Sequence, residues 1–175
     1  MKPNITPRDV ETPVKSNDLI VSKTDTRGRI TYANRTFMRI SGYYVRDLLG
    51  AQHNIIRHPD MPRGIFQLLW QMIQRGDECF AYVKNLCADG TYYWVLANIT
   101  PDRDVHGEVR GYFSVRRQAN PTAIRSLQPL YREMLTIEQR AGRGSAPDAS
   151  LAWLQQQLQQ QHIDYNYFIL QHHHA

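Results

Sequence analysis

Residues 78–118 contain three successive runs of alternating side chains, and this pattern constrains the fold more than any other feature of the chain. The runs are ECFAYVKNLC, TYYWVLANIT and EVRGYFSVRRQ. Alternation with a period of two residues is typical of strands that bury one face. ADG supplies a tight turn between the first two runs, and DRDVHG supplies a longer loop between the second and third. The sequence therefore predicts a three-stranded antiparallel meander.

The residues before this meander predict a hairpin followed by helices. DLIVSKT and RITYA flank the turn DTRG and are typical of two paired strands. Asn34 is a natural N-cap for the short helix RTFMRISG, which Gly42 closes, and VRDLLG forms another helical turn. A longer helix is expected from about Pro62 to Arg75, because its apolar residues recur at i, i+3, i+4 and i+7. This order predicts an α+β fold, with helices on one face of a five-stranded antiparallel sheet.

The two ends of the chain differ in composition from this central part. Before residue 18 there are three prolines and no periodicity, and Asn120-Pro121 is typical of a new helix start. AGRGSAPD is expected to be a linker before a helix with a narrow leucine stripe. We give the terminal HHHA no metal-binding role. The expected units are an N-terminal arm or cap (1–17), the main domain (18–119), a linker helix (120–141), and a C-terminal helix and tail (142–175).

The composition argues against a membrane protein, an exported protein and a nucleic-acid-binding protein. No apolar run approaches the ~20 residues of a membrane-spanning helix, and the N-terminus has no signal-like apolar segment, so we expect a cytoplasmic protein without membrane insertion. The formal net charge is +5, but the basic residues are scattered apart from Arg116-Arg117 and QRAGRG. We therefore expect a solvated basic surface and no nucleic-acid partner. Cys79 and Cys87 are expected to be reduced core thiols.

The stretch NIIRHPDMPRGIFQLLW, residues 54–70, places ionisable groups directly before the long helix. Helix N-termini favour anions, and the planar guanidinium of Arg57 suits a phosphate. His58 adds a donor, and Asp60 is expected to cap the helix or to meet a sugar hydroxyl. From these residues alone, capping plus a surface ion pair is the alternative interpretation.

The first strand of the meander carries one amide on its apolar face. That face comprises Cys79, Ala81, Val83, Asn85 and Cys87. A buried amide without partners costs about 1–3 kcal/mol, so Asn85 is expected to meet either a ligand or the backbone. On the next strand Ala97 leaves room for a ligand, whereas Trp94 and Asn98 face the other way, under the N-terminal arm.

Several motifs together resemble a known family. GRITYANRTFMRISGYYVRDLLG, KNLCADGTYYWV and GYFSVRR have the spacing of a PAS domain. HNIIRHPDMP, VKN, DGTYYWVLAN and PLY are similar to the PAS sensor domains of bacterial aerotaxis receptors, over about residues 18–131. The resemblance implies non-covalent FAD binding and reporting of redox state to the chemotaxis machinery.

The resemblance also implies roles for particular residues. Arg57 and His58 would hold the diphosphate and adenine of FAD, with Asp60 on the loop or a ribose hydroxyl. Asn85 would meet the polar edge of the flavin, and we hypothesise that this amide rotates on reduction. The remaining candidates contact the cofactor by packing or indirectly: His53, Phe66, Trp70 and Asn34. One departure is Cys79, which stands where the family has a tryptophan.

The expected function is a stand-alone redox or oxygen sensor that signals to another protein. A chemoreceptor, a kinase or a cyclic-nucleotide enzyme would each fit as the partner, and a homodimer is allowed. A ligand-free interaction module is the main alternative, and a haem-binding gas sensor is the third, although the long helix lacks a histidine for the iron. Light sensing is disfavoured because HNIIRH has no cysteine. We expect no catalytic residues and no metal site, since no nucleophile motif accompanies His58 and no further ligands accompany His53.

Overall fold

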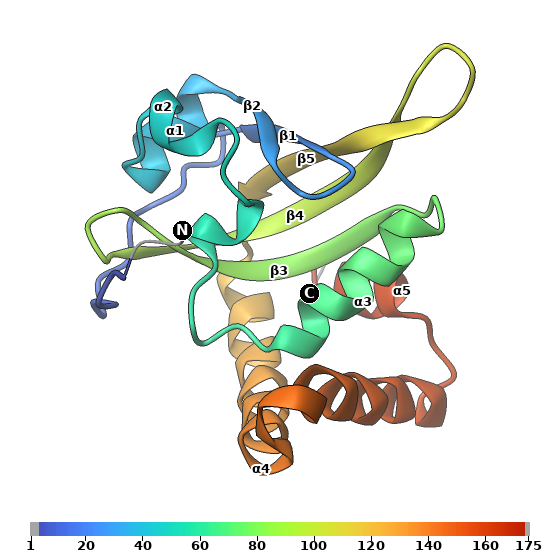
Figure 1. Ribbon diagram of the computed structural model, residues 1–175. Coiled ribbons are helices and arrows are strands. Elements are labelled where there is room, and N and C mark those ends of the chain that lie inside the picture. The colour runs from blue at the N-terminus through green and yellow to red at the C-terminus, as the bar shows by residue number, and fades with distance from the viewer. Residues whose placement is uncertain (1–3, 174–175) are drawn as a thin grey trace.

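A computed structural model describes residues 4–173, and its centre is a five-stranded sheet in the order β2-β1-β5-β4-β3. All paired neighbours are antiparallel, as expected for a hairpin and a meander joined through β1 and β5. The strands are β1 Ile20–Asp25, β2 Ile30–Ala33, β3 Cys79–Leu86, β4 Tyr92–Arg103 and β5 Val109–Gln118. The predicted α+β architecture, an antiparallel sheet with additional C-terminal helices, is confirmed (Figure 1).

The segment between the hairpin and the meander is helical. It comprises α1 Arg35–Ser41, α2 Val45–Leu48, the 3-10 helix η1 His53–Ile56, and α3 Arg63–Gln74. The apolar face of α3 is buried, with Ile65 and Ile73 almost fully enclosed. The sequence did not predict the 3-10 turn at His53. This turn directs residues 52–57 toward the sheet, where Arg57 forms an isolated antiparallel bridge with Asn85.

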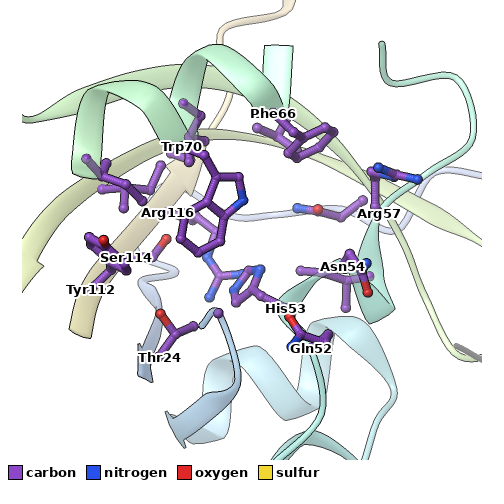
Figure 2. A pocket seen from close by; sticks show the side chains of 18 of the residues that line it. Thr24, Gln52, His53, Asn54, Arg57, Phe66, Trp70, Tyr112, Ser114 and Arg116 are labelled. Atoms are coloured by element: carbon purple, nitrogen blue, oxygen red, sulfur yellow. The ribbon is translucent and has the colours of Figure 1, made fainter. Parts of the chain in front are cut away.

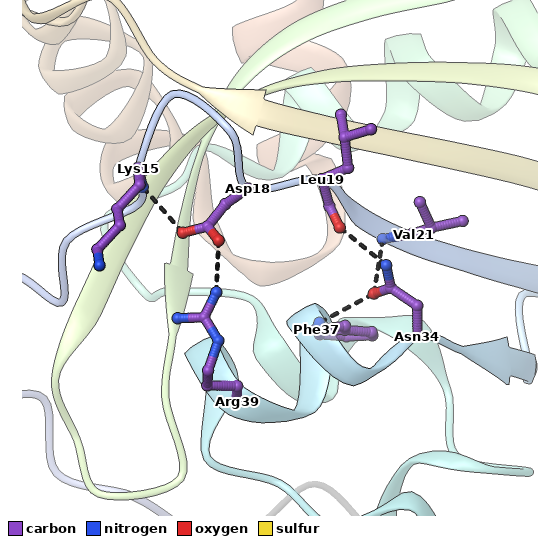
Figure 3. Close-up of polar contacts among 7 residues, drawn as sticks. All are labelled: Lys15, Asp18, Leu19, Val21, Asn34, Phe37 and Arg39. Atoms are coloured by element: carbon purple, nitrogen blue, oxygen red, sulfur yellow. Dashed lines mark hydrogen bonds and ion pairs between the residues drawn. The ribbon is translucent and has the colours of Figure 1, made fainter.

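Asn34 fixes the junction between the hairpin and the helices (Figure 3). Its side-chain oxygen accepts hydrogen bonds from the backbone N–H of Phe37 at 2.9 Å and of Val21 at 3.1 Å, and its amide group donates to the Leu19 carbonyl at 2.8 Å. The expected N-cap is therefore present. Because the same amide also binds two residues of the first strand region, it holds the start of α1 against the sheet.

The C-terminal part is more helical than the sequence indicates. α4 spans Pro121–Gln160, and α5 spans Tyr165–Gln171. The prediction that AGRGSAPD is a linker is wrong, because helical geometry resumes directly after Gly142. Gly142 is the non-helical residue of α4, with φ 77° and ψ 170°, a conformation that glycine adopts without the penalty of a side chain. The linker is thus reduced to a kink at one residue.

The first part of α4 covers the outer face of the sheet. The Tyr131 ring stacks on Trp94 with ring centroids 6.4 Å apart, and the Tyr131 hydroxyl donates a 2.7 Å hydrogen bond to the Tyr82 carbonyl. Trp94 was expected to lie under the N-terminal arm, so this expectation needs correction: the ring that stacks on it belongs to α4. After the kink, α4 packs against α3 (Figure 1).

The side chain of Asn166, in α5, binds the free edge of β3. It donates to the Glu78 carbonyl at 2.8 Å and accepts from the Phe80 N–H at 2.9 Å. These backbone groups flank Cys79 and are the pair that a neighbouring parallel strand would use. One asparagine side chain therefore replaces part of a missing sixth strand.

The N-terminal arm pairs with the turn between β3 and β4. The Arg8 N–H donates to the Gly90 carbonyl at 2.7 Å, and Thr12 and Val10 exchange backbone hydrogen bonds with Tyr92. Residues 1–3 of the expected arm and 174–175 of the expected tail lie outside the described residues. Within residues 4–173, no helix is long and apolar enough to cross a membrane.

Both cysteines are buried and reduced, as expected. Burial, together with the charge of Glu78, raises the pKa of the Cys79 thiol to about 12. A thiol with so high a pKa remains protonated near neutral pH and is a poor nucleophile.

Candidate functional site

A cavity of about 280 Å³ lies between the inner face of the sheet and the helices η1 and α3 (Figure 2). Its volume is near the lower end of the range for small-molecule sites, ~300–1,000 Å³. The apolar part of its wall comprises Ile56, Phe66, Leu69, Trp70, Ile73, Val83, Ala97, Ile99 and Tyr112. The polar part comprises Thr24, Gln52, His53, Asn54, Arg57, Gln67, Asn85, Ser114 and Arg116, and Gly28 completes the lining. Among these described residues there is no carboxylate and no cysteine.

Arg116 is the most unusual side chain of this wall, because it is only 2% exposed. Its guanidinium lies 4.4 Å from the Phe37 ring centroid and donates one 2.7 Å hydrogen bond to the Ser22 hydroxyl. Its Nε and Nη1 atoms are buried without a hydrogen-bond partner among the described residues. Burial lowers the pKa of Arg116 to about 10, so it still carries its charge near neutral pH. A buried cation with unused donors is costly and is suited to an electron-rich ligand.

Ser22 connects Arg116 to His53. The Ser22 hydroxyl oxygen lies 3.1 Å from His53 Nε2. Since arginine can only donate, the single hydroxyl proton of Ser22 is left to donate to Nε2, and we assign the neutral tautomer with its proton on Nδ1. Burial and the charge of Arg116 lower the pKa of His53 to about 3, which keeps the ring neutral. His53 lines the cavity as a neutral side chain, and it stacks on Phe37 with ring centroids 6.2 Å apart.

Asn85 and Ala97 lie on the sheet side of the cavity, as the alternation predicted. Asn85 is only 3% exposed, so its side-chain amide is a buried polar group on the cavity wall. Ala97 pairs directly with Arg116 across β4 and β5. Its small methyl group leaves space beside the Arg116 guanidinium. The amide of Asn85 and the cation of Arg116 thus belong to the wall of the same cavity.

Trp70 and Phe66 form the helical side of the cavity, and Trp70 points into it (Figure 2). The indole packs edge-on against Tyr112, with ring centroids 5.4 Å apart. It also approaches the β1–β2 turn so closely that a Cβ at Gly28 would lie 2.9 Å from the ring. Trp70 therefore packs the cavity wall against the β1–β2 turn, and Gly28 allows that contact.

Arg57 lies at the rim of the cavity, above the Phe66 ring at 5.5 Å from its centroid. Burial lowers the pKa of Arg57, the neighbouring Arg63 lowers it further, and Glu138 opposes both effects. The rim is thus positively charged, and the Arg57 guanidinium packs on the face of the Phe66 ring.

The structure places three predicted site residues outside the cavity wall. Asn34 serves the helix cap described above. His58 is buried against Tyr92, and its Nδ1 accepts a 3.1 Å hydrogen bond from the Asp60 N–H. The Asp60 carboxylate forms an ion pair with Lys84 at 2.7 Å. In this arrangement, His58 and Asp60 join the loop to β3 and do not line the hollow.

The expectation that Asp60 caps α3 is wrong. The N-cap residue of α3 is Pro62, which makes no side-chain cap. The Gly64 N–H donates instead to the Glu138 carboxylate at 2.9 Å, which comes from α4. Sequence reasoning could not find this cap because 74 residues separate the two partners.

Arg116 was missed, because the pair Arg116-Arg117 was assigned to a solvated basic surface. The signal was available in the parity of the last strand, because Tyr112, Ser114 and Arg116 share one face. Tyr112 and Ser114 are compatible with the interior, and that places Arg116 there as well.

Among the described residues, no group of three or more metal-ligating side chains comes together.

Comparison with known proteins agrees with this architecture. Residues 30–116 match the family model described as the PAS fold. These residues form a PAS domain. The surrounding chain is 38% identical over 134 residues to the aerotaxis receptor of Escherichia coli K12, which covers 77% of this chain and 25% of the receptor. It is 33% identical over 106 residues to a nitrogen fixation regulatory protein of Klebsiella pneumoniae, covering 61% of this chain and 21% of that protein.

Solved structures give the same fold. The PAS domain and its flanks align with the light state of the blue-light photoreceptor Aureochrome1 LOV at a TM-score of 0.55 and 21% identity, covering 70% of this chain and 93% of that one. A light-oxygen-voltage domain from work on a flavin analogue aligns at a TM-score of 0.53 and 20% identity, covering 71% and 87%. The chain spans only about a quarter of the aerotaxis receptor.

Proposed function

We propose that this PAS domain binds FAD non-covalently in the cavity and acts as a redox sensor that signals to a partner protein. The observation that carries the proposal is Arg116, a buried cation that lines a cavity whose described wall has no carboxylate, and whose Nε and Nη1 atoms have no hydrogen-bond partner among the described residues. Folding leaves that charge uncompensated, and an electron-rich ligand compensates it. The relatives named above, with an aerotaxis receptor among them, make a flavin the preferred ligand.

The residues present fit the polar and apolar parts of this cofactor. Bound FAD supplies a redox centre that exchanges electrons reversibly. Arg116 would donate to the carbonyl-bearing edge of the ring, and Asn85 would offer both an acceptor and a donor there. Phe66 and Trp70 would cover the ring, and Arg57 at the rim would meet the phosphates. His58 and Asp60 would contribute by holding the loop that carries Arg57.

Asn85 is the residue we propose as the first responder. It is buried and lines the cavity, so a ligand there can determine which end of its side-chain amide faces the hollow. A change in the hydrogen-bonding pattern of the ligand would favour one orientation over the other. The backbone of Asn85 pairs with that of Arg57 in an isolated bridge. A rotation of the Asn85 side chain would therefore also affect Arg57 at the rim.

The cavity favours FAD over the other cofactors considered. Light-driven chemistry of the LOV type needs a cysteine beside the ring, and the described wall contains none. Haem needs a free axial ligand, whereas Nε2 of His53, the histidine that lines the cavity, already bonds to Ser22. We further propose binding and signalling rather than catalysis. A stable homodimer and a role in energy taxis are compatible with the proposal.

Titration with FAD tests the proposal. We expect the purified chain to bind FAD with quenching of flavin fluorescence, and Arg116→Met to weaken binding at least ~10-fold through the loss of charged hydrogen bonds. Arg117→Met is the matched control, because the neighbouring guanidinium is exposed and should not affect affinity. Equal affinities for the two variants would refute the role of Arg116. No binding of FAD by the wild type, after unfolding and refolding with excess cofactor, would favour a ligand-free interaction module.

A further inference from the structure

The helix α3 is enclosed between the cavity and the C-terminal part of α4. Phe66 and Trp70 face the hollow, while the N-terminal turn of α3 is packed against α4 around its kink. A Cβ at Gly64 would clash with the Ser150 hydroxyl and would lie 2.9 Å from the Leu151 nitrogen. The two helices are therefore in backbone contact at this point, so a shift of one requires a shift of the other.

Glu138 connects the three segments that meet there. It is 8% exposed, and one of its carboxylate oxygens accepts both the Gly64 N–H at 2.9 Å and the Ser150 hydroxyl at 2.7 Å. A carboxylate at this position satisfies the Gly64 N–H, a donor in the first turn of α3 that has no acceptor within the helix. The same carboxylate acts electrostatically on Arg57, at the rim of the cavity.

Gln67 provides a direct route from the cavity to α4. Its side chain lines the cavity, and its amide group donates a 2.6 Å hydrogen bond to the Asp148 carboxylate. The side-chain oxygen of Gln67 is buried without a partner among the described residues. A ligand that donates to this oxygen, or that moves the amide, acts on the contact with Asp148 as well.

The backbone between these contacts contains a natural hinge. Gly142 is non-helical, and a Cβ on it would meet no atom within 4 Å. Glu138 lies before this residue and Asp148 and Ser150 lie after it, so the hydrogen bond between Ser150 and Glu138 spans the kink. The two parts of α4 can therefore change their angle at Gly142 without a steric barrier at that position.

We propose that residues 138–150 form a latch that senses the position of α3, so that the occupant of the cavity controls how firmly the C-terminal segment docks. The occupant is FAD if the proposed function holds, and to that extent this inference rests on it. By thermodynamic reciprocity, a latch that is tightened by the ligand also tightens ligand binding by the same factor. The C-terminal segment then becomes the part of the chain that a partner protein reads.

Hydrogen exchange measured by mass spectrometry tests the latch in the full chain. Glu138→Ala is compared with Glu133→Ala, which removes an exposed glutamate of the same helix. Without FAD, we expect Glu138→Ala to accelerate amide exchange in α3 and in residues 144–160 by about 10-fold or more, and Glu133→Ala to leave it unchanged. With FAD, we expect slower exchange at 144–160 in the wild type and an affinity about 10-fold lower in Glu138→Ala.

The outcomes separate this inference from the proposed function. If FAD binds but leaves exchange at 144–160 and the affinity of Glu138→Ala unchanged, the latch is refuted and the flavin site stands. If FAD does not bind, the proposed function fails, and exchange without ligand still decides whether Glu138 couples α3 to residues 144–160. Should Glu138→Ala not fold, Ser150→Ala replaces it, since that variant removes one hydrogen bond and retains the cap. Unchanged exchange in α3 in the folded variant overturns the inference.

Discussion

The neutral state of His53 makes the stability of the protein depend on pH in a defined range. Its pKa falls from an ordinary value of 6.5 to about 3 on folding, because the ring is buried beside Arg116. Below pH 6.5 the unfolded chain binds a proton that the folded chain does not, so stability decreases as the pH falls toward 3. Each pH unit in this range corresponds to about 1.4 kcal/mol.

The perturbation that isolates this effect is His53→Gln. Glutamine retains an acceptor for the Ser22 hydroxyl but does not titrate. Between pH 7.5 and 5.0 the linkage predicts a loss of up to about 2 kcal/mol of unfolding free energy in the wild type. Because the surface of His53 is only partly buried, solvent screening reduces this value toward about 1 kcal/mol. The variant should lack this component, whatever its absolute stability.

Urea unfolding at several pH values, followed by circular dichroism, measures the difference. The buried or hydrogen-bonded aspartates do not interfere, because the pKa values of Asp18, Asp89 and Asp102 are lowered and their contributions are lost only below about pH 4. Parallel pH profiles for wild type and His53→Gln, within about 0.5 kcal/mol, would refute the buried neutral histidine and with it the assigned tautomer.

Three further variants probe the cavity and its supports. Arg116→Met should leave the ligand-free protein equally stable or up to about 3 kcal/mol more stable in urea, since an uncompensated buried charge is removed; a clear loss of stability would contradict this. Gly28→Ala should cost at least about 1 kcal/mol more than Gly107→Ala in thermal unfolding, because both have positive φ but only Gly28 lies against Trp70. Tyr131→Phe should cost about 1–2 kcal/mol by loss of its buried hydrogen bond to β3, and unchanged stability would show that water replaces it.

The pattern of the sequence was sufficient for the sheet and for much of the cavity wall. Alternation placed Asn85 and Ala97 on the inner face, and the helical period placed Phe66 and Trp70 on one helix, because both periods are local properties of the backbone. Arg116 was missed because its type suggests a surface position and only its strand parity indicates burial.

The contacts of the C-terminal segment could not be predicted in the same way. Glu138 caps a helix that lies 74 residues earlier in the chain, and nothing in the local pattern around residue 138 specifies such a partner. The kink at Gly142 was expected as a linker, because a cluster of glycine, serine and proline is typical of loops. Helix packing overrides that preference here. The chain is helical on both sides of Gly142, and only this residue departs from helical geometry.

The asparagine that completes the edge of β3 has a practical consequence for anyone who shortens this protein. A chain ending near residue 119 would retain the PAS domain but lose α5 and with it the hydrogen-bond partner of Glu78 and Phe80. The exposed backbone would then be available to the same edge of another molecule. Self-association of such a fragment would reflect the missing cover and would give no information on the oligomeric state of the full chain.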